Sequence, residues 1–178
     1  MQLSGKRIAI FVDNLYQEME VWYPLYRLRE AGAVMLTVGA RAGETYTSKH
    51  GYPVYCEKAY SDVSTSQFDG VIVPGGNAPD LIRRHPAANH LVREIDKQGK
   101  LVASICHGAW VLCSADILKD RKATCYFAIK DDVIHAGAEY VDAEVVVDRN
   151  LVTSRKPDEL PAFCRAAIAV LTTVKASK

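Results

Sequence analysis

The segment SICHG, residues 104–108, carries the residue types of a nucleophilic site. It begins inside the apolar run 101–105, which is typical of a buried strand, and it ends where a helical pattern starts. A nucleophile at such a turn needs small residues two positions before and after it, because the turn is crowded. Ser104 and Gly108 meet this requirement. Cys106 is therefore a candidate nucleophile, with an inert buried cysteine as the alternative.

The helix expected after Cys106 predicts a lowered thiol pKa, because a helix N-terminus favours the thiolate. His107 is the candidate base, and a simple role at the helix start is its alternative. Neighbouring side chains at such a turn generally point apart, so we expect a direct contact between the thiol and the imidazole to be awkward, with a bond through shifted geometry as the alternative. A histidine base also needs an acceptor for its second ring nitrogen.

Two further segments could complete such a site. Gly75 and Gly76 end the strand pattern 68–76 and could turn backbone N–H groups toward a developing oxyanion, although an ordinary turn is the alternative. Glu18 and Glu20 lie at the start of a predicted helix. A desolvated carboxyl there can stay neutral and donate a hydrogen bond to a thiolate. A favourable contact with the helix dipole is the alternative for each glutamate.

The elements that must position these residues alternate between buried strands and helices. The apolar runs predict strands over 7–13, 34–40, 68–76 and 101–105, and helical spacing predicts helices over 18–32, 78–84, 87–98, 107–118 and 158–173. Paired strands are predicted over 45–58, turning near residues 50–51, and over 139–155, turning near 149–150. This alternation predicts an α/β fold with a mainly parallel sheet covered on both faces. Ligand sites in such sheets gather at the carboxyl ends of the strands, where Asp13, Gly75, Gly76 and Cys106 all lie.

The composition narrows the function classes. The chain has 178 residues, of which 49% are hydrophobic and 24% charged, as expected for one globular domain over 1–178. A net charge of +1 gives no reason to expect nucleic acid or an anionic membrane as partner. The first apolar run ends at Asp13 and is too short for a signal-peptide core or a membrane span.

The cysteines and histidines indicate neither disulfides nor a metal. Five cysteines without a C-x-x-C pair argue against a disulfide framework and favour a reducing cytoplasm. The histidines lack the spacing of metal ligands, and the chain lacks the glycine fingerprints of dinucleotide and P-loop sites. We therefore expect neither a metal nor a cofactor.

The sequence resembles the PfpI family of intracellular cysteine hydrolases, within the superfamily of class I glutamine amidotransferase-like domains. The strings that carry the resemblance are EMEVWYP, SKHGYPV, VIVPGGNAPD, VASICHG, LKDRKATCY, DDVIHAGAEYVD and EVVVDRNLVTSR. They span nearly the whole chain. The resemblance implies a flavodoxin-like three-layer sandwich in which Cys106 is the nucleophile at the elbow.

The resemblance also implies roles for the surrounding residues. The backbone N–H groups of Gly76 and His107 would form an oxyanion site. The acid at the helix start would be Glu20, facing the Cys106 sulfur, with Glu18 as the second choice.

Members of this branch often complete a Cys-His-acid triad across a subunit interface. The acid's position is held here by Asp80, where many relatives carry the longer glutamate. The resemblance therefore implies a homo-oligomer, a dimer or a hexamer, in which Asp80 of one chain reaches His107 of another. Tyr126 corresponds to the family tyrosine near the pocket, with structural packing as the equal alternative.

The leading functional hypothesis is a cofactor-independent cysteine enzyme that acts on methylglyoxal, glyoxal or glycated protein in stress protection. These substrates come from the resemblance to deglycase and glyoxalase III members. A cysteine peptidase or amidase that uses Cys106, His107 and Asp80 is the alternative. A redox-sensing stress protein or chaperone is the alternative from another class, and a scaffold with an inactive site is a third.

Overall fold

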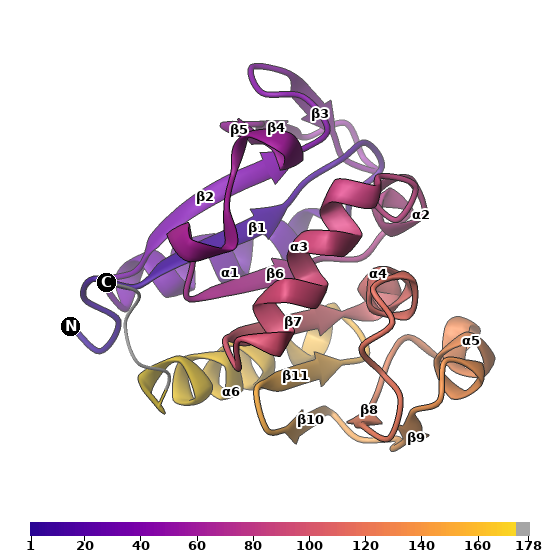
Figure 1. Ribbon diagram of the computed structural model, residues 1–178. Coiled ribbons are helices and arrows are strands. Elements are labelled where there is room, and N and C mark those ends of the chain that lie inside the picture. Colours follow the sequence, from indigo (N-terminus) through magenta and orange to yellow (C-terminus); the bar gives the residue numbers. More distant parts are fainter. Residues whose placement is uncertain (174–178) are drawn as a thin grey trace.

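A seven-stranded sheet forms the centre of the computed structural model, which describes residues 1–173 (Figure 1). Its strands are, in spatial order, β10 (Val145–Asp148), β11 (Leu151–Ser154), β7 (Leu101–Ile105), β6 (Gly70–Val73), β1 (Arg7–Phe11), β2 (Val34–Gly39) and β5 (Lys58–Ala59). All neighbours are parallel except β10, which runs antiparallel to β11. Two small sheets lie outside it: the hairpin of β3 (Thr45–Thr47) and β4 (Pro53–Tyr55), and the parallel pair of β8 (Lys122–Ala123) and β9 (Glu139–Tyr140).

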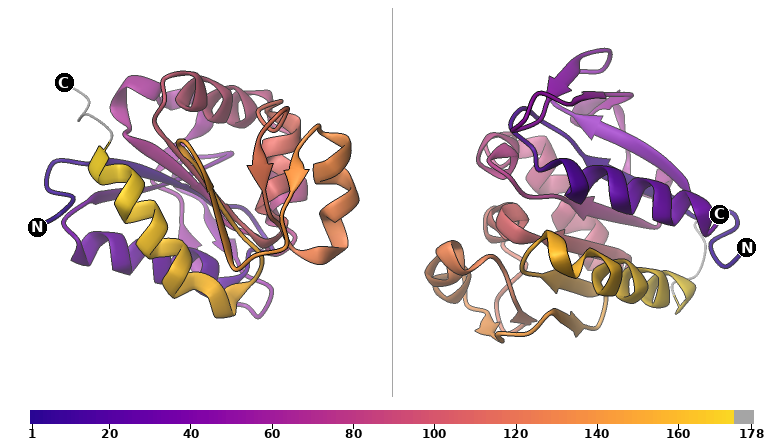
Figure 2. Two further views of the ribbon diagram at one scale, coloured as in Figure 1. Left: turned by 90° about the horizontal axis from the view of Figure 1, so that it is seen from below. Right: turned by 180° about the vertical axis from the view of Figure 1, so that it is seen from behind.

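Helices cover both faces of the large sheet (Figure 2). One face carries α1 (Glu18–Glu30) and α6 (Leu160–Thr173), which pack against each other. The other carries α2 (Ala78–Ile82), α3 (Pro86–Lys97) and α4 (Ala109–Ser114), with α5 (Lys130–His135) beside α4. The predicted three-layer α/β sandwich is therefore confirmed; the prediction of one domain over 1–178 includes residues 174–178, which lie outside the described part.

The central strands explain the apolar runs in the sequence. Every residue of β6, β7 and β11 is buried, because helices cover the sheet on both sides and leave no polar face. These strands run in the same direction, so their carboxyl ends meet at one edge of the sheet. Among residues 1–173, no helix combines the length and the apolar character that crossing a membrane requires.

Two predicted elements differ from the structure. The helix predicted over 107–118 is a 3₁₀ turn over 106–108 followed by α4, which ends at Ser114 because Asp116 adopts a left-handed φ of 57°. The paired strands predicted over 139–155 form only over 145–154, since β9 pairs with β8 instead. The short elements β5, β8 and α5 were not predicted, because a few residues show no periodicity.

A buried arginine fastens the loop before β8 to the sheet. The Arg121 side chain is 5% exposed and forms ion pairs with Asp96 of α3 at 3.2 Å and Asp148 of β10 at 3.3 Å. It also donates to the Asp148 carbonyl at 2.6 Å and the Asn150 side chain at 3.2 Å. Removing one member of such a network leaves buried charges without partners.

We predict that Arg121→Met lowers the free energy of unfolding by about 3 kcal/mol, measured by urea denaturation. Arg149→Met is the matched control, because Arg149 pairs with the same Asp148 but its side chain is 68% exposed. That variant should change stability by less than about 1 kcal/mol. Equal effects of the two substitutions would show that burial does not decide the strength of this network.

Candidate active site

Cys106 lies directly after β7, where the chain turns sharply. Its φ is 61°, in the left-handed region, which costs a non-glycine residue about 1–2 kcal/mol. The side chain is mostly buried, at 7% exposure. A Cβ built on Gly108 would lie 2.4 Å from the Val73 carbonyl oxygen and 2.8 Å from the Ser104 hydroxyl. The predicted crowding around the turn is confirmed.

Glu20 is fully buried in the first turn of α1. Its Oε2 accepts a hydrogen bond from the Gly75 N–H at 2.7 Å, while Oε1 has no hydrogen-bond partner among the described residues. Burial disfavours the charged carboxylate and raises the pKa of Glu20 to about 7, against the lowering effect of the Gly75 N–H and the Cys106 side chain. Glu20 therefore exchanges its proton near neutral pH.

Gly75 is the point where the carboxyl and the thiol meet. A Cβ built on this glycine would lie 2.6 Å from Oε2 of Glu20, 2.7 Å from Cβ of Cys106 and 3.0 Å from its Sγ. A side chain at position 75 would push the two groups apart. The glycine is needed for this close approach, and the three predicted segments do converge here.

The thiol pKa differs from the prediction. Burial raises the pKa of Cys106 to about 12, and the negative charge of Glu20 raises it further, whereas the backbone N–H groups of His107 and Gly76 lower it. The turn does lower the thiol pKa, as predicted, but burial raises this pKa by more. Since Glu20 loses a proton near pH 7 and Cys106 holds one to about pH 12, the pair carries one negative charge between these values.

His107 contacts the thiol directly. Its Nδ1 lies 3.3 Å from the Cys106 sulfur, so the contact forms through the shifted geometry that was the alternative expectation. The left-handed backbone at Cys106 departs from the extended geometry in which neighbouring side chains point apart. The imidazole packs between the rings of Tyr126, at a centroid distance of 4.9 Å, and Trp110, at 5.1 Å. Burial lowers the pKa of His107, and the positive charge of Lys49 lowers it further, which favours the neutral base.

Asp80 lies near His107 but does not contact it within one chain. The two residues line the same pocket of about 270 Å³, together with Leu15, Gly76, Asn77, Leu81 and Trp110. The Asp80 carboxylate forms an ion pair with Arg84 of its own chain. No carboxylate in residues 1–173 hydrogen-bonds to the His107 ring. The contact of Asp80 with His107 across a subunit interface stays a prediction.

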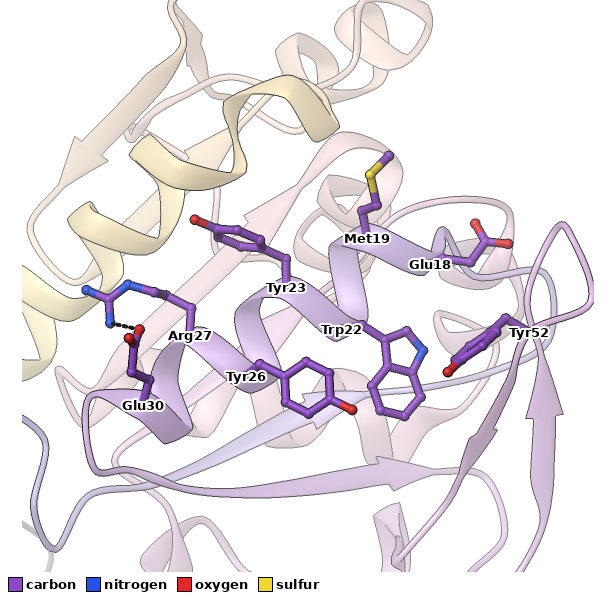
Figure 3. A pocket seen from close by; sticks show the side chains of 8 residues that line it. All are labelled: Glu18, Met19, Trp22, Tyr23, Tyr26, Arg27, Glu30 and Tyr52. Carbon is purple, nitrogen blue, oxygen red and sulfur yellow. Dashed lines mark ion pairs between the residues drawn. The ribbon is translucent and has the colours of Figure 1, made fainter.

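Glu18 turns away from the thiol. Its carboxylate accepts hydrogen bonds from the Ser48 hydroxyl at 2.5 Å and the His50 backbone N–H at 2.9 Å, and its Oε1 lies 2.9 Å from the His50 ring. It borders an open groove of about 710 Å³ on the outer side of α1, where Trp22, Tyr26 and Tyr52 also lie (Figure 3). The structure does not bring Glu18 to Cys106, so only Glu20 of the two candidates faces the thiol.

Two residues near the site were not predicted. The Trp110 ring contacts His107 and lines the small pocket. Lys49 lies in the turn of the β3–β4 hairpin and acts electrostatically on both Glu20 and His107. The string SKHGYPV contains this lysine, but nothing in the string shows that the hairpin folds back toward Cys106. Tyr126 packs against His107, and its backbone N–H donates to the Cys106 carbonyl at 3.3 Å.

No group of three or more potential ligand side chains within residues 1–173 could hold a metal ion. The arrangement instead suits nucleophilic chemistry. A cysteine at a strained strand end, a buried carboxyl and a neutral imidazole define an α/β protein with a nucleophile elbow.

Comparison with known proteins gives the family. The model of the DJ-1/PfpI family matches residues 6–170. "Deglycase PfpI" of Pyrococcus furiosus is 40% identical over 165 residues, which cover 93% of this chain and 99% of that protein. "Protein/nucleic acid deglycase 2" of Escherichia coli is 40% identical over 169 residues, which cover 94% of this chain and 98% of that protein. The chain belongs to the DJ-1/PfpI family.

A solved structure supports the fold in detail. A two-domain protein of Anabaena variabilis with DJ-1/PfpI-like and ferritin-like domains superposes with a TM-score of 0.91 at 39% identity. The match covers 93% of this chain and 48% of that protein, so this chain spans about half of its length. The resemblance found in the sequence motifs is confirmed at the level of the family and the fold.

We predict that Glu20 controls the pH dependence of Cys106 alkylation. In the wild type, the rate of Cys106 alkylation by iodoacetamide should rise up to about pH 7 and then level off. Once the pair has lost one proton, the remaining proton is divided between Glu20 and Cys106 in a ratio that does not change with pH, so the thiolate fraction stays constant. In Glu20→Gln this inflection should vanish and the rate should keep rising with pH. Peptide mass spectrometry of the Cys106 peptide measures both profiles.

Glu30→Gln is the control, because Glu30 lies at the opposite end of α1 from Glu20 and pairs with Arg27. It should keep the inflection near neutral pH. An unchanged inflection in Glu20→Gln would show that another group controls the thiol.

Proposed function

We propose that this protein is a cofactor-independent cysteine enzyme that acts on reactive carbonyl compounds, either free dicarbonyls such as methylglyoxal or their adducts on proteins. The observation that carries the proposal is the buried pair of Glu20 and Cys106, which meet beside Gly75 and hold one proton and one negative charge above about pH 7. His107, whose Nδ1 lies 3.3 Å from the Cys106 sulfur, lines a pocket of about 270 Å³, a size suited to a small substrate. The deglycase names of the relatives from Pyrococcus furiosus and Escherichia coli favour the same substrate class.

The first step transfers the thiol proton to Glu20 and forms a carbon–sulfur bond. The Cys106 thiolate attacks the aldehyde carbon, and the electron pair of the carbonyl moves to its oxygen. The backbone N–H groups of Gly76 and His107, which donate to the sulfur in the free protein, lie beside the atom where this charge develops. Protonation of the oxygen gives a hemithioacetal.

The second step moves a proton within the bound substrate. For methylglyoxal, a base removes the proton from the carbon bonded to sulfur, and the neighbouring ketone carbon receives one, which gives a lactate thioester. His107 is the candidate carrier because its lowered pKa keeps the imidazole neutral and its Nδ1 lies 3.3 Å from the sulfur. Water then cleaves the thioester, so that one methylglyoxal and one water give one lactate.

The proposal also covers the partner of this chain and its location in the cell. We infer a homo-oligomer in which Asp80 of a second chain orients His107, because both residues lie at the mouth of the same pocket. We also infer a cytoplasmic location, which the five free cysteines support.

We predict that the wild type converts methylglyoxal to lactate without added thiol, and that Cys106→Ser lowers kcat/KM at least about a thousandfold. An enzymatic lactate assay measures the product. Cys113→Ser is the matched control, because Cys113 is half-buried and its sulfur contacts the Asp132 carbonyl on the far side of α4. That variant should keep its activity within about twofold of the wild type.

Turnover that survives in Cys106→Ser would contradict the nucleophile assignment. Absence of turnover in the wild type, together with cleavage of peptide reporters, would favour the peptidase alternative. Absence of both, with Cys106 oxidised by peroxide, would favour the redox sensor.

A further inference from the structure

The turn of the β3–β4 hairpin is fastened to the first turn of α1 by a single carboxylate. Glu18 accepts hydrogen bonds from the Ser48 hydroxyl and the His50 backbone N–H, and it pairs with the His50 ring. Although burial raises its pKa, these hydrogen bonds lower the pKa of Glu18 to about 2. The carboxylate is therefore ionised at neutral pH, and it holds the residues on both sides of Lys49.

The same turn joins a ladder of backbone hydrogen bonds that leads to the active site. Lys49 N–H donates to the Tyr16 carbonyl at 3.0 Å, and Leu15 N–H donates to the Thr47 carbonyl at 2.7 Å. On its other side, Tyr16 forms a β-bridge with Gly76. Two strand spacings separate the Lys49 backbone from Gly76, about 10 Å. The four-carbon stem of lysine spans much of this distance.

The Lys49 ammonium acts on the reacting groups. Its positive charge contributes to the pKa of both Glu20 and His107, the two residues that lie beside the Cys106 thiol. Lys49 is exposed, and none of the ion pairs in residues 1–173 involves it. The other cations near the pocket are engaged: Arg84 pairs with Asp80, and Arg83 donates to Ser114. Lys49 is thus the cation that can meet an incoming anion.

A substrate that carries a carboxylate needs such a cation, because the pair of Glu20 and Cys106 is itself negatively charged. Above about pH 7, Glu20 and Cys106 together carry one negative charge, which repels any substrate that carries a carboxylate. A positive charge close enough to act on Glu20 and His107, as that of Lys49 does, offsets this repulsion and favours the anionic substrate.

We propose that Lys49 binds a carboxylate of the substrate, and that Glu18 is the positioning residue that holds Lys49 at the pocket. The site would then prefer adducts of reactive carbonyls that carry a carboxylate over neutral ones. For the reaction itself, this inference rests on the proposed function. The placement of Lys49 can be tested without turnover.

The first experiment compares alkylation of Cys106 by iodoacetate and by iodoacetamide. In both reactions the carbon–sulfur bond forms, the carbon–iodine bond breaks and iodide leaves, so the ratio of the two rate constants reports the effect of the carboxylate. In Lys49→Met the ratio of iodoacetate to iodoacetamide should fall about fivefold or more. Lys49→Arg should keep the ratio within about twofold of the wild type, because the charge remains.

Two further variants distinguish the effect of where the Lys49 charge lies from the effect of the protein's net charge. Lys119→Met removes an exposed positive charge from the turn after α4 and should leave the ratio unchanged. Glu18→Ala removes a negative charge, which by itself would raise the ratio. If Glu18 positions Lys49, the ratio should fall in this variant instead. An unchanged ratio in Lys49→Met overturns the binding role, and a raised ratio in Glu18→Ala overturns the positioning role.

The second experiment measures turnover of two hemithioacetals of methylglyoxal, one with N-acetylcysteine, which is anionic, and one with its neutral amide. The ratio of their kcat/KM values should fall about fivefold or more in Lys49→Met. An unchanged ratio with active enzyme would overturn the preference while leaving the proposed function intact. Absence of turnover of both adducts by the wild type would overturn the proposed function, and the alkylation ratio would still decide the role of Lys49.

Discussion

The burial of the Glu20 carboxyl against Gly75 and Cys106 is the constraint on which the site depends. A carboxylate removed from water and given one hydrogen bond is costly, so the proton stays on the glutamate to about pH 7. The nearby thiol is buried as well and resists ionisation. Neither group alone is a good nucleophile or a good acid at neutral pH. Above about pH 7 they share one proton, which the thiol carries and the Glu20 carboxylate can accept.

The fold supplies the rigidity that this pair requires. Glu20 comes from α1 on one face of the sheet, whereas Cys106 starts the turn toward α4 on the other face. The two side chains meet only because both elements begin at the carboxyl edge of the sheet, where Gly75 leaves room between them. The strained backbone at Cys106 is tolerated because the packed strand β7 and the crowded Gly108 fix the turn on both sides.

Local patterns were sufficient to predict the central strands and the sharp, crowded turn at Cys106. The apolar runs of β1, β6 and β7 are continuous because both faces are covered, and the small residues around Cys106 show the crowding of the turn. The thiol pKa was predicted in the wrong direction, because the degree of burial depends on segments far apart in the sequence. Lys49 was missed for the same reason: its role depends on how the hairpin folds back over residues 15–16, and no local spacing shows that contact.

The most direct test of the account is the titration of the Glu20 carboxyl carbon by ¹³C NMR in protein labelled at glutamate side chains. The signal is assigned as the one missing from Glu20→Gln. A midpoint at about pH 7, together with a shift of that midpoint in Cys106→Ser, is the result we predict. A midpoint near 4.5, the ordinary value, would show that the carboxyl is solvated and that the thiol and the glutamate do not share a proton.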